Sequence, residues 1–387
     1  MCANAPGRPR AATLRFEPEA LRPRCRAGAR NLSIGCGLVV AFLVFAGVGA
    51  ATCGKNPTAG GQAQQGTTGR VSGAPALAPD RRLVFTYYFY WYDAQTGGHL
   101  SPSVMHDHFP STPPPSWRST DWQRKQLVDM TAAGIDIALP VFWGYDRPTD
   151  GWSTQGLPVL AEAWRQASAA GQKPPAIGMF FDTSIVNRRD LTTPTGEAWF
   201  YSNFKTFFSL VPRSEWALVD GRPVAFLFTS DFTDKVNQAT FDFVYGSFQA
   251  DFGVKPYIVR EVSWDYPILR WEGNTRIRDQ QHPIQTENSY QWAAALHGYI
   301  DSGGVAEVGP GYDERGLPGR NGDYTNRAGG SFYTKNLKAA VASGKPLLAI
   351  ETWNEMHEAT DVCESVEYGR QYIDITRSLT DQFHAKR

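Results

Sequence analysis

Apolar runs of strand length alternate with amphipathic runs of helical length from residue 81 to the end of the chain. Eight runs rich in β-branched and aromatic residues predict strands. These strands are expected at 83–92, 135–143, 176–181, 224–229, 256–262, 283–288, 305–308 and 347–353. Helices are expected at 120–130, 158–170, 199–210, 241–252, 331–342 and 368–383. Eight strands, each followed by a helix or a long loop, favour an α/β fold of the (β/α)₈ barrel type over an open doubly wound sheet.

Three of the predicted helices carry residues typical of a helix start. Thr120 and Gln123 have the spacing of a capping box, in which each side chain satisfies a free backbone N–H. Pro158 is expected in the first turn of its helix, where its missing N–H costs nothing. Ser331 is expected to cap the helix that Gly344 ends.

The first 80 residues differ in composition from the rest of the chain. Residues 1–31 carry seven Arg and two Glu, and residues 31–54 carry no charge and are largely apolar. A basic flank before such a run is typical of an export signal or a membrane anchor, with the basic side in the cytoplasm. A buried core helix is disfavoured, because an Arg-rich tail precedes the run and a linker follows it. Cys53 follows small residues, as at a lipoprotein cleavage site, so lipid attachment is a further alternative.

These features divide the chain into three parts. Residues 1–53 are expected to form a signal peptide or an N-terminal membrane or lipoprotein anchor. Residues 54–80 are rich in Gly, Ala, Gln, Thr and Pro and predict a flexible low-complexity linker. Residues 81–387 are expected to form the folded domain, which would lie outside the cytoplasmic membrane, secreted or anchored to it.

The charge and cysteine content exclude several classes of protein. Lys and Arg together number 38, and so do Asp and Glu, which argues against a nucleic-acid binder. No Gly-rich phosphate loop follows the first predicted strand, which disfavours nucleotide chemistry, and no cofactor is expected. Cys363 is the one cysteine after residue 80, so no internal disulfide framework is expected. It could be a reactive thiol, but a buried small apolar residue is favoured.

Polar residues lie just past the ends of several predicted strands. They are Asp93, Asp146, Asp182, Asp231, Asp265, Glu287, Asp313, Glu355 and Glu358. Loops are polar in any fold, but in a barrel these strand ends converge on one face, which is where active sites lie.

The segment 350–360 carries the strongest chemical signal. It leaves an apolar strand and places Glu355 and Glu358 three residues apart, with Asn354 and His357 able to hydrogen-bond the pair or a sugar hydroxyl. Two carboxyl groups in one pocket can have their pKa values pushed apart, as glycoside hydrolysis requires. A surface loop and a metal site are the alternatives. The segment lacks the H-E-x-x-H spacing of a helical zinc site, so no metal is expected.

Aromatic and histidine side chains near the strand ends are candidate sugar contacts. Trp91, Tyr92 and Trp143 could stack on the apolar faces of sugars, but they could equally fill the barrel core. His106 and His108 could form part of a metal site. Because there is no clear third ligand, surface or sugar-contacting roles are favoured.

The sequence resembles glycoside hydrolase family 99, the endo-α-mannosidase family. The segment 352–360 is similar to the family pattern S-F-N-E-W-H-E-G-T, with matches at Asn354, Glu355, His357, Glu358 and Thr360. Segment 308–312 resembles V-G-P-G-Y, and residues 326–333 resemble N-R-x-x-G-x-Y-Y. Segment 87–92 resembles the aromatic opening strand of the family, and residues 134–136 resemble its G-I-D. The matches follow the family's order over residues 81–387 and are dense only over 305–364.

The resemblance implies a retaining, endo-acting hydrolase on a (β/α)₈ barrel without a metal. In the family, the first Glu of the motif assists attack by the sugar's own 2-hydroxyl and gives an anhydro-sugar intermediate. The second Glu is general acid and then general base. Carried over, Glu355 assists the 2-hydroxyl and Glu358 protonates the leaving oxygen. Tyr312 matches a family tyrosine near the site, and Tyr290 corresponds to another that supports the acid.

Two departures from the family pattern leave the sugar open. Met356 stands where the family has Trp and Ala359 where it has Gly, and residues 281–304 match poorly. We therefore expect an exported hydrolase that cleaves α-linkages in a polysaccharide or glycan. The alternatives are a non-catalytic carbohydrate-binding protein on the same barrel and a retaining hydrolase with a direct carboxylate nucleophile. The expected partners are the glycan and, through the N-terminal segment, a membrane, with no nucleic acid; the sugar, the linkage, endo or exo action and the oligomeric state are left open.

Overall fold

The computed structural model describes residues 81–146 and 151–386, and these form a nearly closed barrel of parallel strands. Neighbouring strands follow the order β10-β7-β6-β4-β2-β1-β14-β11. Their bounds are β1 Leu83–Tyr88, β2 Ile137–Phe142, β3 Ala176–Ile177, β4 Met179–Phe181, β6 Arg222–Leu227, β7 Tyr257–Glu261, β10 Asn288–Tyr290, β11 Val305–Val308 and β14 Leu347–Ile350. The short β3 pairs with β2 just before β4 does. The predicted (β/α)₈ barrel is confirmed.

The first and last strands of the barrel, β1 and β14, pair with each other, and the gap in the barrel lies between β10 and β11. β1 pairs with β2 on one side and with β14 on the other, with Leu83 opposite Leu347 and Thr86 opposite Ile350. No ladder joins β10 to β11 in the described part of the chain. A hydrogen bond of 3.0 Å from Gly304 N–H to the Ser289 carbonyl links the two strands at this gap.

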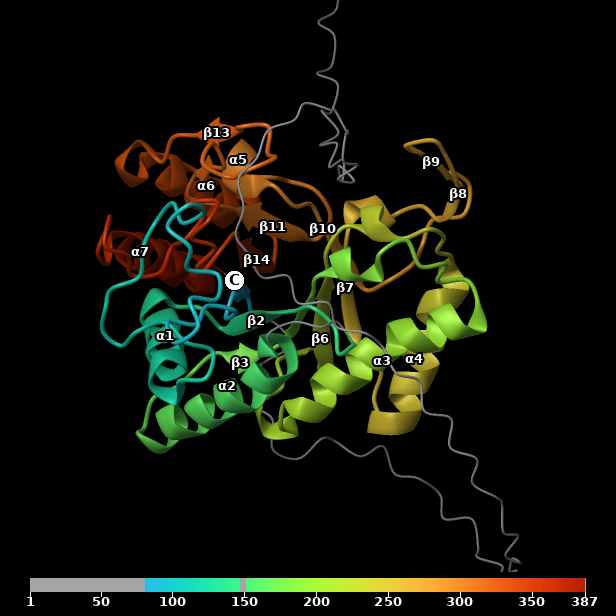
Figure 1. The fold of residues 1–387 in the computed structure, drawn as a ribbon, viewed down its shortest axis with the longest axis horizontal. Coiled ribbons are helices and arrows are strands. Elements are labelled where there is room, and N and C mark those ends of the chain that lie inside the picture. Colours follow the sequence, from blue (N-terminus) through green and yellow to red (C-terminus); the bar gives the residue numbers. More distant parts are fainter. Residues whose placement is uncertain (1–80, 147–150, 387) are drawn as a thin grey trace, which may run out of the picture. The chain divides into compact units, whose positions relative to one another are not determined.

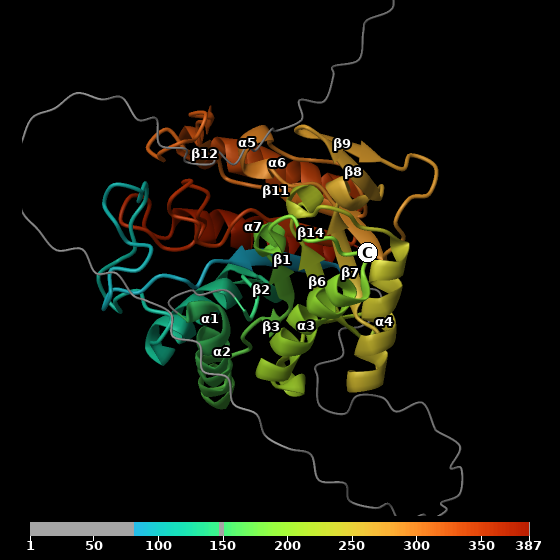
Figure 2. The same ribbon diagram turned by 45° about the vertical axis from the view of Figure 1, so that its right-hand side comes forward.

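Helices surround the strands, as Figures 1 and 2 show. They are α1 Thr120–Ala133, α2 Trp152–Ala169, α3 Pro194–Leu210, α4 Gln238–Phe252, α5 Ala294–His297, α6 Ser331–Ser343 and α7 Gln371–Ala385. β5 (Leu218–Val219) pairs with the amino-terminal end of β6. Two antiparallel hairpins, β8–β9 (Ile268–Glu272 and Thr275–Arg278) and β12–β13 (Tyr312–Asp313 and Tyr324–Thr325), extend the loops that follow β7 and β11.

The barrel interior is packed with aromatic rings. All six residues of β1 are buried, because one face of the strand meets the interior and the other meets helices. Inside, the Tyr87 ring lies 4.6 Å from that of Phe180, and the Phe226 ring lies 5.3 Å from that of Tyr290. The interior is therefore a filled core rather than a channel, and any site must be built from the loops above it.

The predicted start of α2 and the predicted caps of α1 and α6 differ from the structure. α2 begins at Trp152 and not at Pro158, because Trp152 and Leu157 are buried and extend the helix by a first turn and a half. Pro158 is tolerated inside the helix, where its missing N–H leaves one carbonyl of the preceding turn without its usual partner. Ser119, not Thr120, caps α1 by accepting a hydrogen bond from a backbone N–H. Ser331 is the first residue of α6, and its cap is Gly330 in a left-handed conformation.

The sixth barrel strand also differs from its predicted position at 283–288. It forms at Asn288–Tyr290, because, in the part of the chain that the structure describes, the backbone just before Asn288 does not hydrogen-bond to a neighbouring barrel strand. Pro283 cannot donate a hydrogen bond, and Ile284 N–H donates to the Asp265 carbonyl at 2.7 Å. The predictions for 1–53 and 54–80 fall outside the described residues. Among the helices that the structure does describe, none is both long and apolar enough to cross a membrane.

Candidate active site

The two glutamates of the sequence motif lie on a loop, residues 351–363, that directly follows β14. The loop is closed at its base by a hydrogen bond of 2.8 Å from Thr352 N–H to the Thr360 carbonyl. The Thr352 hydroxyl also accepts a hydrogen bond of 2.9 Å from Glu355 N–H. Glu355 and Glu358 are thereby held on one short turn at the carboxyl end of a barrel strand, the usual position of active sites in this fold.

Asn354 and Tyr92 fix this loop to the first strand. The Asn354 amide accepts a hydrogen bond from Phe89 N–H and donates one to the Phe89 carbonyl, both at 2.8 Å. The Tyr92 hydroxyl donates to the Asn354 carbonyl at 3.0 Å and accepts from Met356 N–H at 3.1 Å. Both side chains are fully buried. These two residues, expected to contact sugar, instead hold the loop in place and present no surface to a ligand in this structure.

The two carboxylate oxygens of Glu355 have different surroundings. Oε1 accepts hydrogen bonds from His357 N–H at 2.9 Å and from the His357 ring at 2.6 Å. Oε2 is buried and has no hydrogen-bond partner among the described residues. A buried carboxylate oxygen without a partner is costly, and a ligand hydroxyl would supply the missing hydrogen bond.

His357 is held between Glu355 and a backbone carbonyl. Its Nε2 lies 2.9 Å from the His99 carbonyl, which can only accept, so Nε2 carries a proton. Its Nδ1 faces Glu355 Oε1. Burial acts to lower the pKa of His357, but the Glu355 carboxylate outweighs burial and raises this pKa above its ordinary value. The ring and Glu355 thus form a hydrogen-bonded pair in which His357 holds its proton more tightly than a free imidazole does.

Glu358 has surroundings that keep it protonated to higher pH. Burial, followed by the negative charge of Glu355, raises the pKa of Glu358 to about 7, while Arg320 opposes the rise. The Arg320 guanidinium donates to Glu358 Oε1 at 2.9 Å, and the Glu358 side chain keeps 20% of its surface exposed. One member of the pair therefore suits a proton acceptor, and the other suits an acid that gives up its proton near neutral pH.

The β12–β13 hairpin brings Tyr312 and two residues not anticipated from the sequence to Glu358. The Tyr312 hydroxyl donates to Glu314 at 2.7 Å. Burial, then the charge of Glu358, raises the pKa of Tyr312 well above its ordinary value. Glu314 also accepts from Asn321 N–H at 3.2 Å, which folds the hairpin loop so that Arg320 reaches Glu358.

Glu351 is a further carboxylate beside the site that the sequence reasoning missed. Its two oxygens accept hydrogen bonds from Ala293 N–H at 3.0 Å and Ala295 N–H at 3.1 Å. Burial raises the pKa of Glu351 to about 8, and Glu358 adds to the rise. Tyr290, expected to support the acid, is fully buried in the barrel interior and donates to the Leu227 carbonyl at 3.0 Å.

Trp91 lies beside His357, and Trp143 lies beside Trp91. The Trp91 ring stacks on His99 at 4.5 Å and lies 5.9 Å from both the Trp143 and the His357 rings. Both tryptophans are partly exposed. Of the aromatic residues expected to contact sugar, these two are placed where a sugar bound at Glu355 could meet them.

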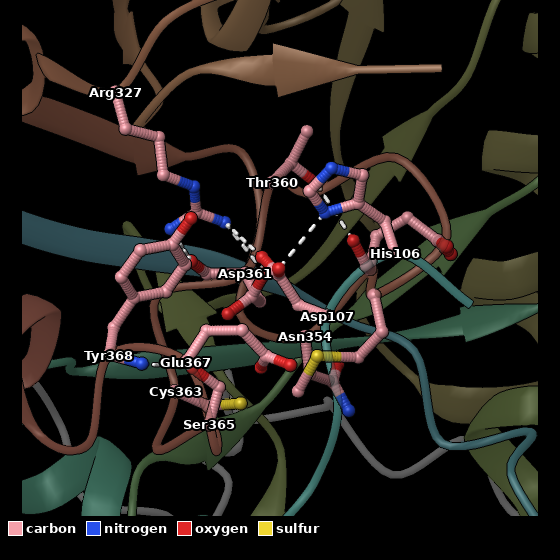
Figure 3. Close-up of polar contacts among 12 residues, drawn as sticks. His106, Asp107, Arg327, Asn354, Thr360, Asp361, Cys363, Ser365, Glu367 and Tyr368 are labelled. Carbon is pink, nitrogen blue, oxygen red and sulfur yellow. Dashed lines mark hydrogen bonds and ion pairs between the residues drawn. The ribbon is translucent and has the colours of Figure 1, made fainter. Parts of the chain in front are cut away.

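A network of charged side chains, largely buried, contacts the loop at Met356 and Asp361, and Figure 3 shows its members. Arg327 points between two carboxylates and donates to Asp361 at 2.6 Å and to Asp107 at 3.2 Å. The His106 ring contacts Asp107 at 2.9 Å and Asp313 at 3.1 Å. The backbone N–H groups of His106 and Asp107 both donate to the carbonyl of Met356, between the two motif glutamates. Within 81–146 and 151–386, no cluster of three or more His, Cys, Asp or Glu could hold a metal ion.

The missed residues had signals in the sequence, although weak ones. Glu351 lies at the end of an apolar strand, and Glu314 lies two residues after the matched Tyr312. Arg320 had no signal, because its contact with Glu358 depends on how the ten-residue hairpin loop folds. A search for every carboxylate near a strand end would have found the first two.

Comparison with known proteins places this fold among the family-99-like barrels. The structure resembles the GH99 endo-alpha-mannosidase from Bacteroides thetaiotaomicron in complex with bis-tris-propane, at 14% identity over 79% of this chain and 97% of that chain, with a TM-score of 0.58. A glycoside hydrolase-like protein matches at 12% identity over 82% of this chain and 98% of that chain, with a TM-score of 0.57. No curated protein matches the chain in sequence. The model of the family described as domain of unknown function DUF5010 matches residues 81–387, and the chain belongs to that family.

Proposed function

We propose that this protein is an exported glycoside hydrolase that cleaves α-glycosidic linkages in a polysaccharide or glycan with retention of configuration. One observation carries the proposal: two glutamates on one loop at the carboxyl end of the barrel have different surroundings. The Glu355 carboxylate is paired with His357, whereas burial and Glu355 raise the pKa of Glu358 to about 7. The fold it shares with structures named endo-alpha-mannosidases supports the same chemistry.

In the first half of the reaction, Glu358 acts as general acid. The 2-hydroxyl of the sugar gives its proton to Glu355 Oε2, the oxygen without a partner, and its oxygen forms a bond to C1. The bond from C1 to the leaving oxygen breaks, and Glu358 gives its proton to that oxygen. The product of this half is an anhydro-sugar and a shortened glycan.

In the second half, the roles of the two residues reverse. Glu358, now a carboxylate, takes a proton from a water molecule whose oxygen attacks C1. The bond from C1 to the 2-oxygen breaks, and Glu355 returns its proton to that oxygen. Two inversions at C1 give net retention. Arg320 lowers the pKa of Glu358 and so favours the carboxylate that this half requires.

The test is hydrolysis of a panel of α-linked glycans and aryl glycosides by the wild type and by two variants. Glu358→Gln removes the proton donor and is expected to lose on the order of 10²–10⁴-fold in rate with a poor leaving group, and much less with an activated aryl group. Glu355→Gln is expected to lose similar amounts with both substrates. Glu364→Gln is the matched control, because Glu364 directly follows the loop but pairs with Lys125 and Arg370.

The outcome also separates the alternatives. A 2-deoxy substrate should react poorly with the wild type, because it lacks the internal nucleophile. A sugar covalently trapped on Glu355 would favour a direct carboxylate nucleophile. Unchanged activity in either Gln variant would refute the roles given to the two glutamates. No hydrolysis by the wild type, with retained glycan binding, would favour a non-catalytic carbohydrate-binding protein.

We also propose that residues 1–53 direct export or anchor the protein and that 54–80 form the linker. The charge pattern of residues 1–54 supports this. Cell fractionation should place the full-length protein outside the cytoplasmic membrane, and recovery in the cytoplasm would refute it.

A further inference from the structure

An exposed arginine with no acidic partner lies on the loop that follows β4. The guanidinium carbon of Arg188 lies 3.2 Å from the centre of the Trp271 ring, on the β8–β9 hairpin. Among the described residues no carboxylate lies within ion-pair distance of it. Stacking on the indole orients the planar guanidinium while leaving its N–H groups free to donate.

The backbone that carries Arg188 adopts an energetically unfavourable conformation. Asn187 and Arg188 both adopt left-handed conformations, with φ of 47° and 63°. Such conformations disfavour residues other than glycine, at roughly 1 kcal/mol or more each. The segment is held there by hydrogen bonds to the loop after β6, from Arg188 N–H to the Phe232 carbonyl and from Asp234 N–H to the Arg189 carbonyl at 3.0 Å. Strain maintained at the carboxyl end of a barrel is a reason to look for a ligand.

Positive charge exceeds negative charge around Arg188. Asp231 forms ion pairs with two arginines, Arg276 at 2.7 Å and Arg278 at 3.6 Å. The other carboxylates nearby have partners of their own, in the pairs Asp190–Lys235, Asp265–Arg260 and Glu272–Arg270. Asp234 influences Arg188 but forms no ion pair with it. Burial, then the charge of Arg276, lowers the pKa of Arg188, while Asp234 and Asp231 oppose the fall.

This excess is local. Residues 32–387 carry five more acidic than basic residues, so a basic group here does not reflect a basic protein. An anion would relieve the repulsion between Arg188 and Arg276 and accept hydrogen bonds from the guanidinium N–H groups of Arg188.

The basic group lies across the barrel mouth from the two glutamates. Arg188 follows β4, Asp231 follows β6, and Trp271 and Arg276 follow β7, whereas Glu355 and Glu358 follow β14. In the strand order, β6 is four places from β14 in either direction around the barrel. Figures 1 and 2 show the β8–β9 hairpin apart from the β12–β13 hairpin, which contacts Glu358. Loops after barrel strands gather on one face, so a glycan extended over that face from the glutamates would reach the basic group.

We propose that Arg188, presented by Trp271 and flanked by Arg276, binds the carboxylate of a uronic acid unit in the glycan, several sugars away from the cleaved bond. The inference rests on the proposed function and narrows its substrate to acidic polysaccharides. A planar carboxylate can accept hydrogen bonds from the two parallel N–H groups of a guanidinium, and the sulfate arm of the test below separates this ligand from a sulfated sugar.

The test measures binding without turnover, in the full-length chain carrying Glu358→Gln. Native gels containing polygalacturonate, which is α-linked and has one carboxylate per sugar, give the affinity from retardation. When Arg188→Gln is introduced into the Glu358→Gln variant, the affinity for polygalacturonate should fall at least tenfold. Methyl-esterified polygalacturonate should bind the Glu358→Gln variant as weakly as neutral dextran does. Arg270→Gln is the matched control, because Arg270 is exposed on the same hairpin but paired with Glu272. It should change binding less than twofold.

Several outcomes would overturn the inference. No retardation by polygalacturonate, or equal retardation with and without Arg188→Gln, would remove the site. An equal loss in the Arg270→Gln control would show that overall surface charge, and not this arginine, is responsible. Retardation by dextran sulfate but not by polygalacturonate would reject a carboxylate ligand. Failure of the proposed function would show separately, as unchanged hydrolysis in the Glu358→Gln variant.

Discussion

Glu215 should make this protein less stable as pH rises through neutrality. The residue ends a short 3₁₀ helix, Arg213–Glu215, and is fully buried. Neither carboxylate oxygen has a hydrogen-bond partner among the described residues. Burial therefore raises the pKa of Glu215 from 4.5 to about 7, and the group is neutral in the folded protein below that pH.

The sign and size of the effect follow from the two pKa values. Because the folded protein binds this proton more tightly, the contribution to stability is fully present below pH 4.5. It declines as pH rises and is lost once pH passes the folded pKa of about 7. At about 1.4 kcal/mol for each pH unit between the two values, the loss by pH 8.5 is at most about 3 kcal/mol.

Glu215→Gln keeps the shape of the side chain and removes its charge at every pH. Urea unfolding of the full-length protein at pH 5 and pH 8.5 measures the free energy of unfolding. The variant should match the wild type within about 1 kcal/mol at pH 5 and exceed it by up to about 3 kcal/mol at pH 8.5. Glu272→Gln is the control, because that side chain is 56% exposed and its pair with Arg270 is worth little. A difference between variant and wild type that is the same at both pH values would refute the reasoning.

Two further expectations concern charged partners. Arg320→Gln removes the guanidinium 2.9 Å from Glu358, so the alkaline limb of the rate–pH profile should move upward by about one pH unit; a downward shift would contradict the role given to Arg320. Arg327→Met leaves Asp107 and Asp361 buried without their cation, and should lower the free energy of unfolding by about 3–5 kcal/mol. The partly exposed pair of Arg370 with Asp129 should cost less than about 1 kcal/mol when broken by Arg370→Met, and an equal loss in both variants would show that burial of the Arg327 cluster is unimportant.

Most of the fold could be predicted because its strands are apolar on both faces. The strands β1, β2, β11 and β14 are buried throughout, and their apolar runs are visible without any knowledge of partners. The errors occur where tertiary contacts override a local signal. Pro158 is typical of a helix start, but burial of Trp152 extends α2 beyond it. A strand was predicted at 283–288, but Ile284 N–H donates to the Asp265 carbonyl in the neighbouring loop instead of to a barrel strand.

The site was predictable to the extent that it lies on one segment. Glu355, His357 and Glu358 are close in the sequence and are close in space. Asn354 belongs to the same segment, but its contact with Phe89 reverses its expected role, and no local pattern reveals a partner 265 residues away. Arg320 and Glu351 contribute through distances and burial that only the folded chain defines.

The bond between Asn354 and Phe89 has a consequence for how the protein is made. The loop that carries the two glutamates takes its shape from a strand synthesised 265 residues earlier. Closing a chain segment of that length costs about 5 kcal/mol in entropy, which the packing of the intervening elements must offset first. During synthesis, the loop that carries Glu355 and Glu358 therefore cannot assemble until the last barrel strand has left the ribosome and met the first. A chain interrupted before Leu347 can hold most of the barrel's residues and still lack the candidate site.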